Sequence, residues 1–358
     1  MKDPNCVEKV SRQLLGYVVW TGVYREGKMN RRTAIRRLAT FFLTTASLAE
    51  AQQAGKIFRI GFLDGGTAAG LAGLLKAFLH ELSKLGWIEG KNFTIEYRFA
   101  ENKGADRLKE LAAELVRLKV DLIVVGGTRP ALAAKSATTT IPIVMVNPGD
   151  PVGTGLVVSL ARPGGNVTGF SSLGTEINTK RLELLKDAVP KLSRVGVMWL
   201  RGVTGAGDLQ MKELTAAAVV LKLKLEEIET RLDAKGLESA FKTAKQKQVG
   251  AIMMSSGLPY LGKRKRIVEL AVKYRLPAIY FLKEFVDEGG LMSYGTDYAD
   301  LFRKAAHYVD KILKGTKPAD LPVQQAMNIE FIINLKAAKQ IGVTVPYELL
   351  ARANRVIK

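Results

Sequence analysis

The chain has 358 residues, 47% of them hydrophobic, and a formal net charge of +20 at pH 7. This length is enough for two domains, and the hydrophobic fraction excludes a largely disordered chain. A single cysteine, Cys6, excludes a disulfide framework, and with only His80 and His307 we expect no transition-metal site. The basic run KRKR (263–266) adjoins an amphipathic segment, so we interpret it as a solvated helix face and expect no nucleic-acid partner.

An export signal is the first recognisable segment, at 29–51. Its first part, MNRRTAIRR, is basic, and the following LATFFLTTASL is apolar but too short to span a bilayer. The closing AEA has the small-x-small pattern of a cleavage site, so we predict cleavage after Ala51. Residues 1–28 precede the signal, and we interpret them as a gene-model extension. An amphipathic N-terminal helix is the alternative to the signal.

Strands and helices alternate along the rest of the chain. Short apolar runs rich in β-branched residues predict strands, and apolar residues at helical spacing predict helices. The first half is expected to hold strands at 58–63, 93–99, 122–125, 143–146 and 166–170, and helices at 71–86, from a cap at Asp106 to Leu118, and from Pro130 onward.

The second half continues the alternation. Its predicted helices are 180–189, 208–221, 237–246, 261–274, 298–313 and 335–342, and its predicted strands are 194–200, 224–229, 250–254, 277–281, 290–295 and 323–333. These are more strands than one open sheet of ordinary size holds, so we expect two parallel sheets, and hence two lobes. The sequence contains no Pro/Gly/Ser-rich linker, so we expect chain crossovers to join the lobes.

The stretch 121–156 predicts a ligand site. The apolar run 122–125 ends in two glycines followed by Thr128, and a second run leads to a loop that carries Asp150. Open α/β sheets bind ligands at the carboxyl ends of their strands. The N–H groups that open the helix after Gly127 attract anions, whereas Asp150 would attract a cation. We therefore predict a site for a small zwitterion or polar solute; ordinary strand-to-helix turns are the alternative.

Motifs for catalysis and cofactor binding are missing from the sequence. The loop DGGTAAG (64–70) follows the first strand, but its glycine spacing is not that of a dinucleotide site. The sequence has no phosphate-binding loop and no Gly-x-Ser-x-Gly signature. We predict no catalytic residue, no metal ligand and no cofactor. An exported α/β enzyme that uses Asp150 and Glu284 is the alternative.

Several sequence segments together resemble those of one protein family. They are LGWIEGKNFTIEYRFA (85–100), TTTIPIV (138–144), GDPVGTGL (149–156), LARPGGNVTG (160–169), KRLELLK (180–186), GGLMSYG (289–295), VDKILKG (309–315) and PADLP (318–322). From about Phe58 to its C-terminus, the chain resembles the ABC-transporter substrate-binding family that includes tryptophan-binding-protein-like members.

The resemblance implies a type 1 periplasmic-binding-protein fold, in which two doubly wound parallel-sheet lobes are joined by three crossovers. Such lobes close on a solute by hinge motion. Lobe 1 is expected at 56–168 plus 291–320, and lobe 2 at 169–290 plus 321–358.

The resemblance also implies where the ligand binds. Thr128 and Asp150 match the strand-end loops of the family's first lobe. The loop SSGLPY (255–260) departs from the pattern, because relatives often carry an acidic or amide residue there. The full set of predicted ligand residues is Asp64, Gly127, Thr128, Asp150, Ser256, Tyr260, Glu284 and Tyr294.

The function implied is that of a non-enzymatic, monomeric periplasmic receptor. It would deliver a small, amino-acid-like solute to an ABC permease and its ATPase, and it would contact the membrane only through the permease. A solute sensor for a membrane signalling protein is one alternative. A DNA-binding repressor of the same core fold is another, but it would need an N-terminal helix-turn-helix in place of the export signal.

Overall fold

The computed structural model describes residues 56–172, 174–200 and 207–358. The predicted export signal, the segment 1–28 and Cys6 lie outside these ranges. None of the helices in the described ranges combines the length and the apolar character that crossing a membrane requires.

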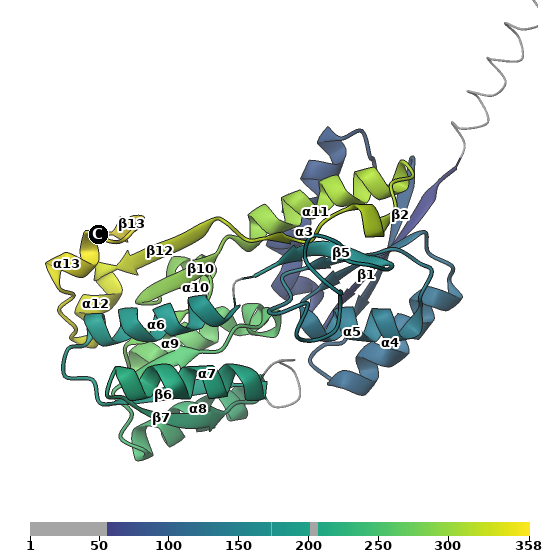
Figure 1. The fold of residues 1–358 in the computed structure, drawn as a ribbon. Coiled ribbons are helices and arrows are strands. Elements are labelled where there is room, and N and C mark those ends of the chain that lie inside the picture. The colour runs from purple at the N-terminus through teal and green to yellow at the C-terminus, as the bar shows by residue number, and fades with distance from the viewer. Residues whose placement is uncertain (1–55, 173, 201–206) are drawn as a thin grey trace, which may run out of the picture. The chain divides into compact units, whose positions relative to one another are not determined.

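Six described strands form sheet 1, in the order β11-β5-β4-β3-β1-β2, and all neighbouring pairs are parallel. The helices of this lobe flank the sheet (Figure 1). The elements of lobe 1 are β1 (Phe58–Asp64), α3 (Ala68–Lys84), β2 (Phe93–Phe99), α4 (Ala105–Arg117), β3 (Leu122–Gly126), α5 (Thr128–Ala137), β4 (Ile143–Val146), β5 (Val167–Ser171), α11 (Tyr298–Leu313), the 3-10 helix η2 (Pro318–Asp320) and β11 (Gln324–Gln325).

Seven described strands form sheet 2, in the order β13-β12-β10-β9-β8-β6-β7. They are parallel except between β10 and β12, which run antiparallel. The elements of lobe 2 are α6 (Gly174–Ala188), β6 (Arg194–Trp199), α7 (Gly207–Val220), β7 (Lys224–Glu229), α8 (Ala234–Gln246), β8 (Ala251–Met254), the 3-10 helix η1 (Leu258–Lys263), α9 (Arg264–Lys273), β9 (Ala278–Tyr280), α10 (Lys283–Asp287), β10 (Met292–Thr296), β12 (Ile329–Asn334), α12 (Leu335–Ile341), α13 (Tyr347–Leu350) and β13 (Arg355–Ile357).

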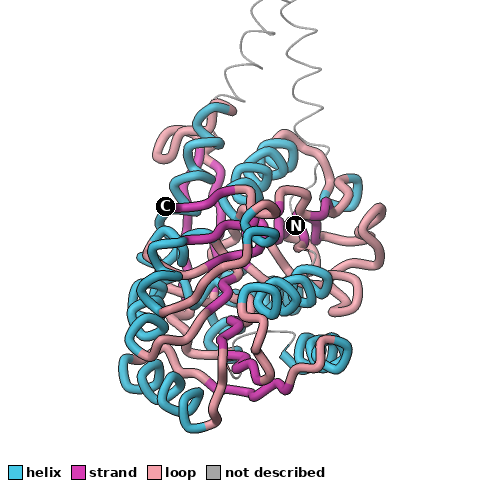
Figure 2. Tube along the Cα trace, turned by 90° about the vertical axis from the view of Figure 1, so that its left-hand side faces the viewer, coloured by secondary structure: helices cyan, strands magenta, loops and turns pink. Residues whose placement is uncertain are grey.

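Both sheets carry helices on their two faces, so their central strands are apolar throughout. In β3, Val124 packs on the side of α3 and α11, whereas Val125 packs on the side of α4 and α5, because successive side chains point to opposite faces. In β8, Ile252 faces α8 and α9, and Met253 faces α6 and α7. Figure 2 shows the helices and strands of the described chain as a tube coloured by secondary structure. The expected α/β fold with two doubly wound lobes is confirmed.

The sheet pairings shift the predicted lobe boundaries. The predicted division assigns 291–320 to lobe 1, but β10 hydrogen-bonds to β9 and β12 and therefore belongs to sheet 2. The same division assigns 169–171 and 321–325 to lobe 2, but β5 and β11 pair with each other in sheet 1. Within the described residues, the chain passes between the sheets after Ser171, Thr296 and Gln325, which gives the three expected crossovers.

Two local predictions are corrected. The segment 323–333 is not one strand: β11 and β12 are separated by 326–328, where the chain leaves one sheet for the other. Gly104, with a φ of 89°, precedes α4 in place of the predicted cap Asp106. Asp106 lies in the first turn instead, where its carboxylate still favours the helix N-terminus.

Candidate functional site

Buried polar atoms that lack a hydrogen-bond partner gather at the carboxyl ends of the strands. Buried polar groups are nearly always paired in folded proteins, so such a gathering makes this place a candidate ligand site. Most of the described side chains with such an atom lie at or just beyond a strand end, namely Asp64, Asn102, Arg129, Asn147, Ser171, Trp199, Tyr280, Glu284 and Thr296.

Asp64 ends β1, and its side chain is fully buried. The N–H of Gly66 donates to its Oδ1 over 2.6 Å, whereas no described group bonds to Oδ2, which lies against Gly126. Leu258 of η1 lies beside the same glycine, so a residue from lobe 2 helps to enclose this carboxyl of lobe 1. Burial raises the pKa of Asp64 to about 7, against the smaller opposing effect of the Gly66 hydrogen bond.

Arg181 brings a positive charge to the same end of sheet 2. It lies in α6, and only 3% of its surface is exposed. Its Nε donates to the carbonyl of Tyr294 over 2.7 Å, and Nη1 donates to Asn178 Oδ1 over 2.8 Å and to Ser256 Oγ over 2.9 Å. Burial lowers the pKa of Arg181 to about 10, so the guanidinium remains charged at neutral pH.

Tyr298 links groups from both lobes. It opens α11 after the chain leaves sheet 2, and its side chain lies beside that of Asn147, which follows β4 in sheet 1. Burial raises the pKa of Tyr298 to about 12; Arg181 and Asn147 oppose the rise, and Glu284 adds to it. The Tyr298 ring also packs against the Phe281 ring of lobe 2, with 6.3 Å between their centroids, so Tyr298 lies where the two lobes meet.

Glu284 supplies a negative charge from the first turn of α10. Its Oε2 is buried, and no described group donates a hydrogen bond to it. Burial is the largest cause of the raised pKa of Glu284. The adjacent Lys283 is held by Asp297 at 3.0 Å and by Glu330 at 3.2 Å.

The residues predicted in lobe 1 after β3 and β4 lie at the start of α5 and in the turn after β4. Gly127 precedes α5 with a φ of 89°, a conformation that favours glycine, and its N–H donates to Val146. Thr128 Oγ1 accepts from the N–H of Gly149 over 3.2 Å and so ties the two strand-end loops together. Asp150 is exposed, and its Oδ1 accepts from the N–H of Gly153 over 2.8 Å and caps its own turn.

The residues predicted in lobe 2 separate into two groups. Ser256 and Tyr294 both hold Arg181, through the Ser256 hydroxyl and the Tyr294 carbonyl. Tyr260 is fully buried in the core, where its hydroxyl lies 3.3 Å from Ser255 Oγ and 3.3 Å from the Met198 carbonyl. Arg181, Asn147 and Tyr298 are called the Arg181–Tyr298 cluster below. Of the residues predicted in lobe 2, Ser256, Glu284 and Tyr294 lie close to this cluster, whereas Tyr260 lies in the core.

Arg181, Asn147 and Tyr298 are absent from the predicted set. A signal for Arg181 was available, since it lies at helical spacing before Leu185 and Ala188, both buried, so a charge falls on an apolar stripe. Asn147 has a backbone φ of 61°, a value that residues other than glycine and asparagine rarely adopt. The sequence alone does not reveal that angle.

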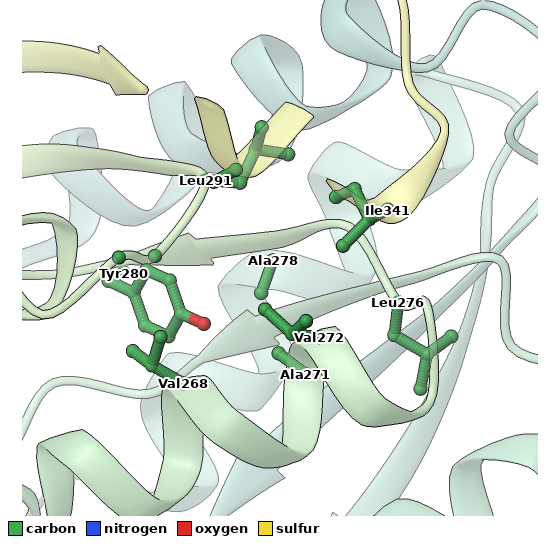
Figure 3. A pocket seen from close by; sticks show the side chains of 11 residues that line it. Val268, Ala271, Val272, Leu276, Ala278, Tyr280, Leu291 and Ile341 are labelled. Carbon is green, nitrogen blue, oxygen red and sulfur yellow. The ribbon is translucent and has the colours of Figure 1, made fainter. Parts of the chain in front are cut away.

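Two hollows of the described surface lie outside this strand-end site. One, in lobe 2, has a volume of about 10 Å³, the space of about one water molecule, and is lined by aliphatic side chains around Tyr280 (Figure 3). The other, of about 400 Å³, includes Lys135, Val158 and Val167, and therefore lies at the amino end of β5. Neither hollow contains a residue of the Arg181–Tyr298 cluster.

The chain is similar to known proteins in sequence and in structure. The profile of the family described as ABC transporter substrate binding protein matches residues 68–357. A tyrosine-binding protein of Clostridioides difficile (strain R20291) is 31% identical over 275 residues, covering 74% of this chain and 75% of that protein.

Two solved structures are also similar. An ABC domain in complex with L-Trp from Streptococcus pneumonia is 27% identical, with a TM-score of 0.74 over 84% of this chain and 100% of that chain. The ligand-free, open structure of a substrate-binding protein with adhesive properties from Clostridium difficile is 26% identical, with a TM-score of 0.56 over 84% of this chain and 99% of that chain.

Proposed function

Because the chain belongs to the family of ABC transporter substrate-binding proteins, we propose that it binds an α-amino acid between its lobes and delivers it to an ABC permease. The observation that carries this proposal is the set of buried polar groups without described partners at the strand ends of both sheets. Charges of both signs, on Arg181 and Glu284, suit a zwitterion better than a neutral solute. The tyrosine-binding relative and the L-Trp complex support the same ligand class.

Delivery would depend on closure of the lobes around the ligand. A ligand that contacts both lobes favours the closed arrangement, which then binds the permease. The TM-score is higher with the L-Trp complex than with the ligand-free open structure, at nearly equal sequence identity. This difference, together with the contacts between η1 and the loop after β1, supports a closed arrangement of the described chain.

The proposed setting is the periplasm. The signal at 29–51 would direct export, and the mature, monomeric, non-enzymatic protein would reach the membrane only by binding the permease with its ATPase. Mass spectrometry of the protein isolated from the periplasmic fraction should give a mature chain that begins at Gln52. A chain that retains residues 29–51 in the cytosol would contradict export.

A thermal-shift screen of the purified protein tests the ligand class. The panel holds the twenty amino acids, with pentoses and hexoses as controls. A ligand present at a thousandfold excess over its Kd stabilises the folded state by about 4 kcal/mol. We expect at least one amino acid to raise the melting temperature by several degrees, with the ligand recovered unchanged. Stabilisation by a sugar alone would contradict the amino-acid proposal, and conversion of the ligand would contradict a purely binding role.

A further inference from the structure

Arg181 is a buried charge whose described partners are all neutral. They are a main-chain carbonyl, an amide oxygen and a hydroxyl, on Tyr294, Asn178 and Ser256. No carboxylate of a described residue lies within ion-pair distance of its guanidinium. Taking a charge out of water without a counter-charge is costly. Its Nε and Nη1 donate to these three groups, which leaves Nη2 to donate to a ligand carboxylate.

Glu284, in α10 of the same lobe, carries the opposite charge and also lacks a charged partner for its buried oxygen. Its Oε2 is buried and receives no hydrogen bond from any described group. The nearest ammonium in sequence, on Lys283, is already bound to Asp297 and Glu330. Glu284 therefore retains an acceptor that suits a cationic donor.

Contacts around Gly295 connect Arg181 with the segment that leads into α10 and carries Glu284. Among the described residues no ion pair joins Arg181 to Glu284. A Cβ added to Gly295 would lie 3.6 Å from Arg181 Nη2 and 3.0 Å from the carbonyl carbon of Phe281, which precedes Glu284 by three residues. The Phe281 ring in turn packs against the Tyr298 ring, with 6.3 Å between their centroids. Asn147, from lobe 1, lies beside the same tyrosine, and its buried Oδ1 accepts no hydrogen bond from a described group. A ligand seated beside Tyr298 would therefore meet a positive group, a negative group and a neutral amide at once.

We propose that Arg181 binds the α-carboxylate and Glu284 the α-ammonium of the ligand, so that this pair selects the amino-acid zwitterion whatever its side chain. This inference rests on the proposed amino-acid function and goes beyond it by assigning each charge of the ligand to one residue. Ser256, Tyr294 and Asn178 are positioning residues that orient Arg181. Asp64, farther along sheet 1, would lie outside this pair and contact another part of the ligand.

Ligands that lack one charge test the assignment by calorimetric titration. The series is L-tyrosine, tyramine without the carboxylate, and 3-(4-hydroxyphenyl)propionate without the ammonium, with the matching L-tryptophan series beside it. Hydrogen bonds to charged groups typically contribute tenfold to a hundredfold in affinity. We expect the unmodified protein to bind both truncated ligands at least tenfold more weakly than the amino acid.

Variants then identify which residue meets which charge. Glu284→Gln should weaken binding of the amino acid at least tenfold and leave the propionate, which has no ammonium, nearly unchanged. Arg181→Gln should do the reverse, sparing tyramine. Because Arg181 also holds three neutral groups, its variant is compared with the unmodified protein by circular dichroism and thermal melting. The control is Asp287→Asn, on the exposed face of α10, which should leave all affinities unchanged.

The outcomes separate the two proposals. If the amino acid binds the unmodified protein but each variant weakens all three ligands equally, or Glu284→Gln binds normally, the charge assignment is overturned and the amino-acid function stands. If neither L-tyrosine, L-tryptophan nor any other amino acid binds the unmodified protein, the amino-acid function is overturned, and the assignment with it.

Discussion

Asp64 shows how enclosing a strand-end carboxyl changes its chemistry. A carboxyl near pKa 4 in the unfolded chain has a pKa of about 7 in the folded one, because burial disfavours its charged form. At a pH between these two pKa values, Asp64 keeps its proton in the folded state and releases it in the unfolded state. Raising the pH through this window therefore lowers the free energy of unfolding, by roughly 4 kcal/mol for three pH units.

Asp64→Asn should remove this dependence. The amide keeps an oxygen for the Gly66 N–H and carries no charge. We expect the melting temperature of the ligand-free protein to fall from pH 5 to pH 8, and to fall less in the variant. Calorimetric melts at both pH values provide the measurement. Equal falls for the two proteins would show that Asp64 does not titrate in this window.

Tyr280 gives a second prediction at this scale. Its hydroxyl is buried among aliphatic side chains, and no described group bonds to it, so removing the oxygen loses no hydrogen bond. Tyr280→Phe should leave the free energy of unfolding unchanged or raise it by about 1 kcal/mol. The matched control is Tyr308→Phe, which loses a hydrogen bond of 2.7 Å to the Pro322 carbonyl and should cost about 1 kcal/mol. Urea titration measures both, and a loss in Tyr280→Phe as large as the control's would contradict the account.

The sequence predicts individual site residues unevenly, for physical reasons. Asp64 and Glu284 could be found because an acidic residue beside a buried strand is conspicuous in the sequence. Asn147 and Tyr298 could not, because their proximity arises from a contact between two distant segments. Asp150 looked equivalent to Asp64, but glycines at 149 and 153 let its loop fold back, so its carboxylate caps its own turn.

At the scale of elements, η1 and α3 bring the two lobes into contact through glycine. A Cβ added to Gly70 would lie 2.9 Å from the backbone nitrogen of Gly262 and 3.1 Å from its Cα. These are backbone atoms, which cannot move aside as the end of a flexible side chain can. The lobes approach this closely because neither position carries a side chain.

Gly70→Ala should therefore oppose closure. If closure is coupled to binding, the apparent Kd rises as the closed population falls, and we expect about a tenfold loss of affinity. The control is Gly73→Ala on the same helix, where no described atom lies within 4 Å of the added Cβ. It should bind normally and gain up to about 1 kcal/mol of stability, since alanine favours helix. Equal affinities in the two variants would argue against a role of this contact in closure.

Most helices and strands were predictable because their apolar periodicity is strong. The exceptions are short elements such as α10 and β13, which hold too few residues for a period to emerge. The division of 323–333 into β11 and β12 depends on which sheet each piece joins, and that choice is made by contacts far away in the sequence. The same reason explains the shifted lobe boundaries.

At the scale of the whole molecule, delivery by closure requires that ligand binding and lobe closure are linked. Small-angle scattering of the purified protein should show a radius of gyration that falls as the amino acid is added and saturates with the binding sites. Gly70→Ala should have the larger radius at subsaturating ligand. A radius that is independent of ligand, in a protein that binds it, would mean that capture needs no closure.

Calorimetric titration of the unmodified protein with L-tyrosine and L-tryptophan tests the central claim most directly. We expect saturable binding of one amino acid per chain, with a Kd in the micromolar range or tighter. Absence of binding by these two and by every other amino acid, in a protein that melts cooperatively, would contradict it.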